Sequence, residues 1–337
     1  MALAREKWLE QTREQPLEPA LRICDPHHHL WDRPQSRYML EELAADAEGH
    51  NVRSTVFVEC MSMYNADLPE ALRPVGETEF VQGVAAQSAS GQYGPMRAAA
   101  GIVSFADLSL GTAVDEVLEA HVRASPGRFR GIRHAAGWHA SDEIRNSHTQ
   151  PPQGLLAEPS FREGFGCLEK RGLSFDAWLY HPQLHELVDL ARASEGTTII
   201  LDHVGGPLGI GPYAGKREQV FEAWKGPMEE LSRCPNVVVK LGGLTMPICG
   251  FDFHKRDKPP GSAELAETLA PYYLFCIERF GPTRCMFESN FPVDRASCSY
   301  GVLWNAFKRI SKGFASNERA ALFHDTAVRV YRLEDGR

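Results

Sequence analysis

An α/β fold of alternating strands and helices is the class that the sequence predicts. Eight short apolar runs, most of them rich in β-branched residues, alternate with segments whose apolar residues follow helical spacing. At 337 residues the chain is longer than a small domain, but it fits one α/β barrel with insertions. We therefore expect a single domain over residues 1–337. Within it, residues 1–20 should form an N-terminal arm that covers the barrel floor or a partner subunit.

Each expected strand has a short apolar core. In most cases polar or charged residues come directly after that core. They span residues 21–24, 53–60, 98–103, 129–134, 173–180, 197–203, 236–241 and 284–288. The expected helices have apolar residues three and four apart. They span residues 40–49, 77–88, 112–124, 161–171, 184–191, 220–228, 264–280 and 318–331, with one more around Phe307. The loops 135–159 and 245–261 are long enough to act as lids.

Composition and charge exclude several classes of protein. Hydrophobic residues make up 43% and charged residues 24%, as in ordinary globular enzymes, and no apolar run is long enough to span a membrane. The net charge of −8 and the scattered Lys and Arg argue against nucleic-acid binding. The eight cysteines form no C-x-x-C pair, and the N-terminus has no signal-peptide core. We therefore expect a cytoplasmic protein with a small-molecule substrate.

Three consecutive histidines follow the first expected strand. In an extended segment His27 and His29 point to one face and His28 to the other. Neutral imidazole is a common ligand of zinc and similar metals, so the same-face pair could begin a coordination sphere. An expression tag or a surface histidine cluster is the alternative, but this cluster is internal and lies between Ile23 and Leu30. The sequence therefore favours a buried metal site.

Further candidates lie at the ends of other strands. Glu59 could ligate a metal or pair with an arginine, although a loop acid would look the same. Arg133 would offer a planar fork to a substrate carboxylate, with His134 beside it, unless Arg133 forms a structural ion pair. Tyr64 and Trp138 could shape the pocket. The sequence does not distinguish a Trp138 that covers the ligand from one exposed at a dimer contact.

The apolar run 197–201 brings a second histidine to the pocket. His203 would face the site, whereas alternation would turn Asp202 to the other face, where it would pack or orient a neighbour. Lys240 could bind an acidic group or extend outward from the barrel wall.

Four motifs resemble the amidohydrolase-related enzymes, in the branch of metal-dependent barrel hydrolases that includes sugar-lactone and muconolactone hydrolases. The motifs are Asp-x-His-x-His-Leu-Trp-Asp at 25–32, Gly-Ile-Arg-His at 131–134, Leu-Asp-His-Val-Gly at 201–205 and Met-Phe-Glu-Ser-Asn-Phe-Pro at 286–292. The resemblance implies a (β/α)8 TIM barrel with long βα loops, one divalent metal such as zinc or manganese, and a homodimer. It also makes His181 a candidate ligand, because more distant relatives place a zinc ligand near that strand end.

The sequence departs from this family at Asn290, where many members carry an Asp that holds the metal and takes a proton from water. An amide cannot act as a general base. Glu288, Asp294 and Glu59 are the candidate substitutes. Glu288 ranks first because alternation places it on the same face as Asn290.

Together the histidine pair and the resemblance predict a hydrolase. We expect it to open a lactone, or cleave an ester or amide, of a small carboxylated or polyhydroxylated substrate by metal- or histidine-assisted attack of water. In a metal-free version the histidines and Arg133 would polarise the carbonyl directly. Two alternatives stay open at this point: a metal-dependent non-oxidative decarboxylase of a carboxylated aromatic, and a non-catalytic barrel that binds a small molecule.

Overall fold

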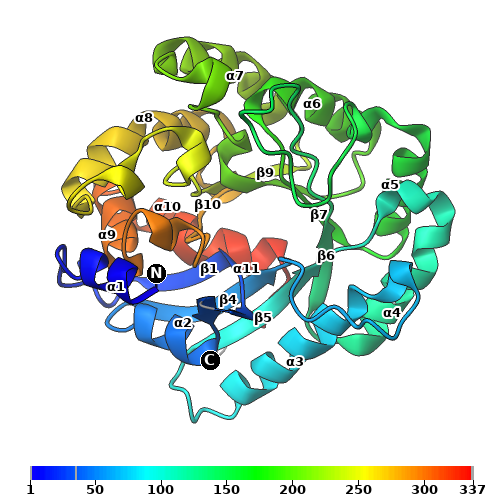
Figure 1. Ribbon diagram of the computed structural model, residues 1–337, viewed down its shortest axis with the longest axis horizontal. Helices are drawn as coiled ribbons and strands as arrows, with labels where there is room; N and C mark the ends of the chain where they lie inside the picture. Colours follow the sequence, from blue (N-terminus) through cyan, green and yellow to red (C-terminus); the bar gives the residue numbers. More distant parts are fainter. Residues whose placement is uncertain (1, 35, 335–337) are drawn as a thin grey trace.

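The computed structural model describes residues 2–34 and 36–334, and its centre is an eight-stranded parallel sheet (Figure 1). The strands follow the order β1-β4-β5-β6-β7-β8-β9-β10. Their bounds are Arg22–His28 (β1), Asn51–Val58 (β4), Arg97–Ser104 (β5), Phe129–Arg133 (β6), Ser174–Ala177 (β7), Ile199–Leu201 (β8), Val237–Leu241 (β9) and Cys285–Phe287 (β10). The sheet closes where the Asn290 N–H donates to the His27 carbonyl at 2.9 Å and the His29 N–H to the Phe291 carbonyl at 2.8 Å. The predicted α/β barrel is confirmed.

Helices surround the sheet as an outer ring (Figure 1). The ring consists of α2 (Leu40–Asp46), α3 (Val75–Ala89), α4 (Val114–Ala124), α5 (Pro159–Lys170), α6 (Leu184–Ala193), α7 (Arg217–Ser232), α8 (Ser262–Phe280) and α9 (Tyr300–Ile310). The short helices α10 (Ser316–Ala320) and α11 (Thr326–Val330) follow it at the C-terminal end. The apolar faces of the ring helices pack against the outer side of the strands in the main hydrophobic core. No helix in the described part of the chain combines the length and apolar character that crossing a bilayer requires.

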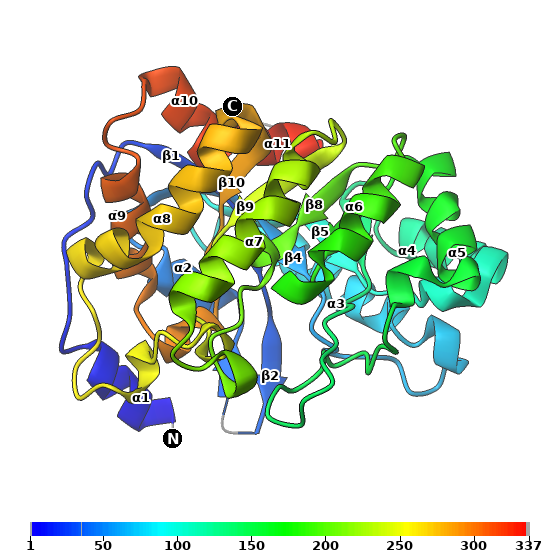
Figure 2. The same ribbon diagram turned by 90° about the horizontal axis from the view of Figure 1, so that it is seen from above.

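The two chain ends lie on opposite sides of the barrel (Figure 2). The C-terminal helix α11 closes the floor, where Tyr331 packs with Cys24, Val56 and Met286 from the strands. The N-terminal helix α1 (Ala2–Leu9) instead lies on the side where the strands end. There the Trp8 indole donates to the carbonyl of Arg256, in the loop after β9, at 2.8 Å. The expectation that the arm covers the floor is therefore wrong; the floor is already filled by the C-terminal segment.

Two local differences from the sequence prediction bear on the site. The polar stretch after Leu30 forms a hairpin of β2 (Trp31–Arg33) and β3 (Ser36–Tyr38) at the barrel mouth. The strand predicted over 197–203 is shorter, because β8 ends at Leu201 and a tight turn follows. In that turn both His203 and Val204 have positive φ angles, of 54° and 48°.

Candidate active site

The three histidines at the end of β1 point in two directions, as strand alternation predicts. The rings of His27 and His29 lie 5.0 Å apart, centroid to centroid. His28 turns away from them, and its Nε2 lies 2.8 Å from the Thr55 hydroxyl. His27 is fully buried, and Arg133 Nη1 lies 3.4 Å from its Nε2. His27 is therefore the histidine of this cluster that reaches the centre of the barrel.

Three side chains from distant parts of the chain meet beside His27. The possible ligand atoms of His27, His203 and Glu288 all lie within 4.8 Å of one another. Glu288 Oε2 lies 2.8 Å from His27 Nδ1, and Glu288 Oε1 lies 2.6 Å from His203 Nδ1. Two imidazoles and one carboxylate are a donor set that suits zinc and similar divalent ions. These three residues could hold a metal ion.

The protonation states of this group suit a metal. Burial, and then the charge of Lys240, lower the pKa of His27. Burial alone would raise the pKa of Glu288, but the imidazoles of His203 and His27 outweigh it and lower the value to about 2. Metal ligation needs a neutral imidazole and an ionised carboxylate. His27 and Glu288 meet these requirements at neutral pH.

The turn after β8 explains how two successive side chains face the same site. Because His203 adopts the left-handed conformation, the strand alternation stops at Asp202, and both side chains point inward. Asp202 lies 2.9 Å from Lys240 and 3.4 Å from Arg133. The prediction that Asp202 faces the outer layer is therefore wrong. A Cβ at Gly243 would lie 2.4 Å from His203 Cγ, so this glycine leaves the space that the imidazole fills.

A buried lysine lies directly beneath the three-residue group. Lys240 Nζ lies 2.6 Å from Asp176 Oδ2, 2.9 Å from Asp202 Oδ1 and 3.2 Å from His27 Nδ1. Burial opposes its charge, but Asp176 and Asp202 together raise the pKa of Lys240 to about 12. Lys240 therefore faces the interior rather than extending outward. Sequence reasoning missed Asp176, although a carboxylate inside an otherwise apolar strand was a usable signal.

Arg133 and Glu59 form a buried ion pair. Arg133 Nε donates to Glu59 Oε1 at 2.7 Å, and Nη2 donates to the Glu59 carbonyl at 2.6 Å. The other carboxylate oxygen of Glu59 lies 3.0 Å from His148 Nε2. The guanidinium group of Arg133 is thus bound by Glu59 rather than free for a substrate carboxylate. This is the structural ion pair that the sequence left open as the alternative role of Arg133. His148 was not predicted; its position in the polar loop 135–159 was the only signal.

Two other candidate ligands lie outside the three-residue group. His29 Nδ1 lies 2.8 Å from the Val58 carbonyl, and its ring stacks on Trp31. His181 accepts the Leu208 N–H at its Nδ1 over 3.2 Å, on the β7 side of the barrel. In both rings Nδ1 contacts a backbone group. Among the described residues the group that could hold a metal ion consists of His27, His203 and Glu288, without His29, His181 or Glu59.

The predicted substrate-binding residues spread around the mouth. His134 is buried and its Nδ1 accepts the Leu108 N–H at 3.3 Å. Trp138 is half-buried, and its backbone N–H donates to Gln183. Tyr64 is half-buried and lines a cleft of about 570 Å³. Tyr64 therefore has a position that could contact a bound molecule.

Asn290 and Asp294 follow Glu288 at the barrel closure. Asn290 has a positive φ of 55°, and among the described residues its amide nitrogen has no hydrogen-bond partner. Neither carboxylate oxygen of Asp294 makes a hydrogen bond of normal geometry within the described part of the chain. Burial raises the pKa of Asp294 to about 7, against the opposing effect of His203. Asp294 is therefore a buried carboxyl group whose polar neighbours are Thr245 and Asn290.

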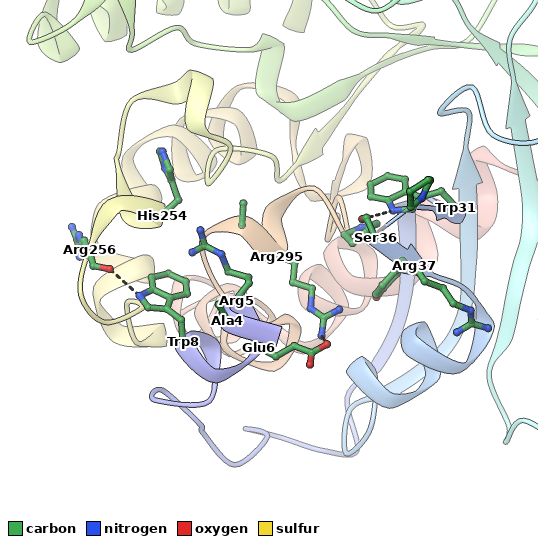
Figure 3. Close-up of a pocket in the computed structure, with 14 residues that line it drawn as sticks. Ala4, Arg5, Glu6, Trp8, Trp31, Ser36, Arg37, His254, Arg256 and Arg295 are labelled. Atoms are coloured by element: carbon green, nitrogen blue, oxygen red, sulfur yellow. Dashed lines mark hydrogen bonds and ion pairs between the residues drawn. The ribbon is translucent and has the colours of Figure 1, made fainter. Parts of the chain in front are cut away.

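A second cavity opens on the other side of the mouth, with a volume of about 750 Å³. Figure 3 shows its side chains, which come from α1, the hairpin and the loops after β9 and β10. Arg5 and Arg295 line it, and Trp31 separates it from His29. The mouth is thus flanked by two clefts.

Comparison with known proteins identifies the family. A family model described as amidohydrolase matches residues 24–333. The chain belongs to the amidohydrolase family. The uncharacterized protein y4mH of Sinorhizobium fredii is 33% identical over 333 residues, which cover 92% of this chain and 98% of that protein. The L-fucono-1,5-lactonase of Burkholderia multivorans is 24% identical over 94% of this amidohydrolase chain and 97% of its own length.

Solved structures confirm the fold of this amidohydrolase. A crystal structure of a Burkholderia multivorans amidohydrolase with bound zinc superimposes with a TM-score of 0.71. The two chains are 21% identical, and the match covers 93% of this chain and 99% of that one. At this identity the likeness concerns the fold.

Proposed function

We propose that this amidohydrolase opens a small lactone by metal-assisted attack of water. The observation that carries the proposal is the convergence of His27, His203 and Glu288 at the ends of β1, β8 and β10. In a parallel barrel this end of the strands is where active sites lie. The curated relatives that are named as lactonases support the choice of a lactone within the hydrolase family.

The charges around the group support a divalent cation. At neutral pH four buried carboxylates face two buried cations, so the cluster carries two negative charges in excess. One divalent cation would neutralise that excess. The carboxylates belong to Glu59, Asp176, Asp202 and Glu288, and the cations to Arg133 and Lys240. Uncompensated charge is costly in a buried site. When bound, a divalent ion supplies Lewis acidity toward a carbonyl and toward water.

The protein side chains contribute orientation and proton transfer. Glu288 accepts from the backbone N–H of His203 at 3.1 Å and from its Nδ1 at 2.6 Å, which fixes the orientation of that ring. Arg133 and Lys240 hold positive charge beside His27, where negative charge on the carbonyl oxygen would develop. Asp294 is buried close to His203 and would take the proton from water and return it to the leaving oxygen.

The test is a panel of lactones assayed at neutral pH with a pH indicator. The panel contains sugar 1,5- and γ-lactones, carboxylated lactones and alkyl-substituted lactones. Each is assayed with zinc, with manganese and with a chelator. We expect turnover by the metal-loaded protein, with the ring-opened acid as the product. No turnover of any lactone under all three conditions would refute the proposal, and release of carbon dioxide from a carboxylated aromatic would indicate decarboxylation instead.

A further inference from the structure

A cleft at the ends of β4, β5 and β6 differs in character from the buried cluster that it adjoins. Its volume is about 570 Å³, which suits a small molecule. Its walls come from three βα loops, and they comprise Met61, Tyr64, Glu70, Ala71, Pro74, Phe105, Asp107, Leu110, His148 and Thr149. Since all three loops follow strand ends, the cleft opens on the active-site side of the barrel.

The inner end of this cleft is joined to the three-residue group by polar contacts. His148 lines the cleft, and its Nε2 lies 3.0 Å from Glu59 Oε2. Glu59 in turn accepts from Arg133, whose Nη1 lies 3.4 Å from His27 Nε2. The inner end of the cleft is therefore linked to His27 through two buried side chains, Glu59 and Arg133.

The outer rim of the cleft is apolar and exposed. Four large hydrophobic side chains are exposed among the described residues: Met61 at 50%, Met63 at 46%, Leu110 at 40% and Leu274 at 40%. Met61 and Leu110 line the cleft, and Met63 lies in the chain between the lining residues Met61 and Tyr64. Single exposed apolar residues are common, but two of them at the rim of one cavity, with Met63 on the same loop, indicate a binding surface.

The loop that carries the two methionines is held in a defined conformation. Met61 and Met63 have positive φ angles of 58° and 54°, which is unfavourable for residues with a side chain. The buried Glu77 carboxylate holds the loop, since it accepts the backbone N–H of Cys60 at 3.0 Å and of Ser62 at 2.7 Å. The exposure of the methionines is therefore built into the fold.

The charges of the cleft select against an anion. Its lining includes the carboxylates of Glu70 and Asp107 but no lysine or arginine. The neighbouring arginines are already engaged: Arg73 Nε donates to the Leu68 carbonyl, Arg33 Nη2 donates to the Cys60 carbonyl, and Arg133 pairs with Glu59 and Asp202. A carboxylated substituent would meet the like charges of Glu70 and Asp107 among the lining residues.

We propose that this cleft binds the apolar substituent of an uncharged lactone, with the lactone ring at its inner end. The inference rests on the proposed function for the identity of the reacting group, and it narrows the substrate from polyhydroxylated or carboxylated lactones to alkyl- or aryl-substituted ones. Burial of the substituent against Met61, Phe105 and Leu110 provides the affinity.

The test measures binding separately from turnover. The probe is a γ-lactam with an alkyl chain of increasing length, which resembles the lactone but resists hydrolysis, and its binding is measured by calorimetry. We expect affinity to rise by about fourfold for each methylene that the cleft buries. Leu110→Ser and Met61→Ser should each weaken binding of the long-chain lactam by about tenfold. Leu274→Ser, an equally exposed change on α8, should leave it unchanged.

Each outcome decides the inference. Equal affinity for short and long lactams, or equal binding by all three variants, would overturn the proposal that the cleft binds an apolar substituent. Tighter binding of a lactam whose chain ends in a carboxylate would also overturn it. Turnover of lactones without any preference for the alkyl chain would also overturn it while leaving the proposed function intact. Chain-length-dependent lactam binding without lactone turnover would support the cleft and refute the proposed function. If Leu110→Ser abolished a dimer in sedimentation without affecting the lactam, the rim would be a subunit interface instead.

Discussion

Glu288 holds His203 by two contacts, since Glu288 Oε1 lies 2.6 Å from the imidazole Nδ1 and 3.1 Å from the backbone nitrogen. Because an ionised carboxylate can only accept, His203 Nδ1 carries the proton and Nε2 keeps its lone pair. The other oxygen of Glu288 lies 2.8 Å from His27 Nδ1 without a hydrogen bond of normal geometry, and Lys240 Nζ lies 3.2 Å from the same nitrogen. Glu288 therefore orients His203 by hydrogen bonds and places negative charge beside His27.

Glu288→Gln tests this relationship. An amide of the same shape places no negative charge beside His27, and it is a weaker metal ligand. We expect lactone hydrolysis to fall by about a hundredfold or more, with a parallel loss of bound metal measured by elemental mass spectrometry. Glu267→Gln, on the exposed side of α8, serves as the control. Full metal content in Glu288→Gln would exclude Glu288 as a ligand.

Gly243→Ala should disturb the site without changing any polar group. The new Cβ would lie 2.4 Å from His203 Cγ, and Gly243 has a positive φ of 69°, so the imidazole must move. Because catalytic geometry tolerates little displacement, we expect activity to fall by at least about tenfold. Gly226→Ala is the matched control, since a Cβ there meets no atom within 4 Å. Equal activity of the two variants would show that His203 does not need this position.

Lys240→Met should destabilise the fold, because it leaves the buried Asp176 and Asp202 without their shared cation. Removal of one partner of a buried ion pair costs about 3–5 kcal/mol. The double variant Lys240→Met/Asp176→Asn should recover part of that loss. Urea unfolding of the wild type, both single variants and the double variant measures the coupling. Additive effects of the two substitutions would contradict a direct interaction.

His121 should make stability depend on pH. Burial lowers the pKa of His121 to about 4, although its hydrogen bond to the Phe105 carbonyl opposes this. In the unfolded chain a histidine has a pKa of about 6.5. Neutral His121 therefore makes its full contribution to the free energy of unfolding above about pH 6.5. As the pH falls toward 4, protonation reduces that free energy by about 3 kcal/mol.

The free energy of unfolding of His121→Gln, measured in urea between pH 7 and pH 4.5, should consequently fall less steeply than that of the wild type. His185→Gln, on the exposed face of α6, should retain the slope of the wild type. Parallel slopes for the wild type and His121→Gln would contradict the assigned role of His121.

Local patterns predicted the elements well but only part of the site. The strand order, the same-face direction of His27 and His29, and the positions of His203 and Glu288 at strand ends all follow from alternation and from apolar runs. The left-handed turn at His203 does not, because it depends on space provided by Gly243 from another strand. For this reason Asp202 was assigned to the wrong face.

Interactions between distant strands account for the other differences. Arg133 pairs with Glu59, which lies 74 positions away in the chain. Lys240 pairs with Asp176, which lies 64 positions away. No spacing within a segment reveals such pairs. The floor position of the C-terminal helix likewise depends on packing inside the barrel.

The most direct test of the account is a titration of chelator-stripped, untagged protein with zinc or manganese. Calorimetry would measure the stoichiometry of metal binding, and the rate of lactone hydrolysis would be followed in the same samples. We predict that the rate rises with the first equivalent of metal and that the His27→Ala/His203→Ala variant neither binds that equivalent nor gains activity. Full hydrolysis by the stripped protein, or the same stoichiometry in the variant, would contradict a metal-assisted hydrolase built on His27, His203 and Glu288.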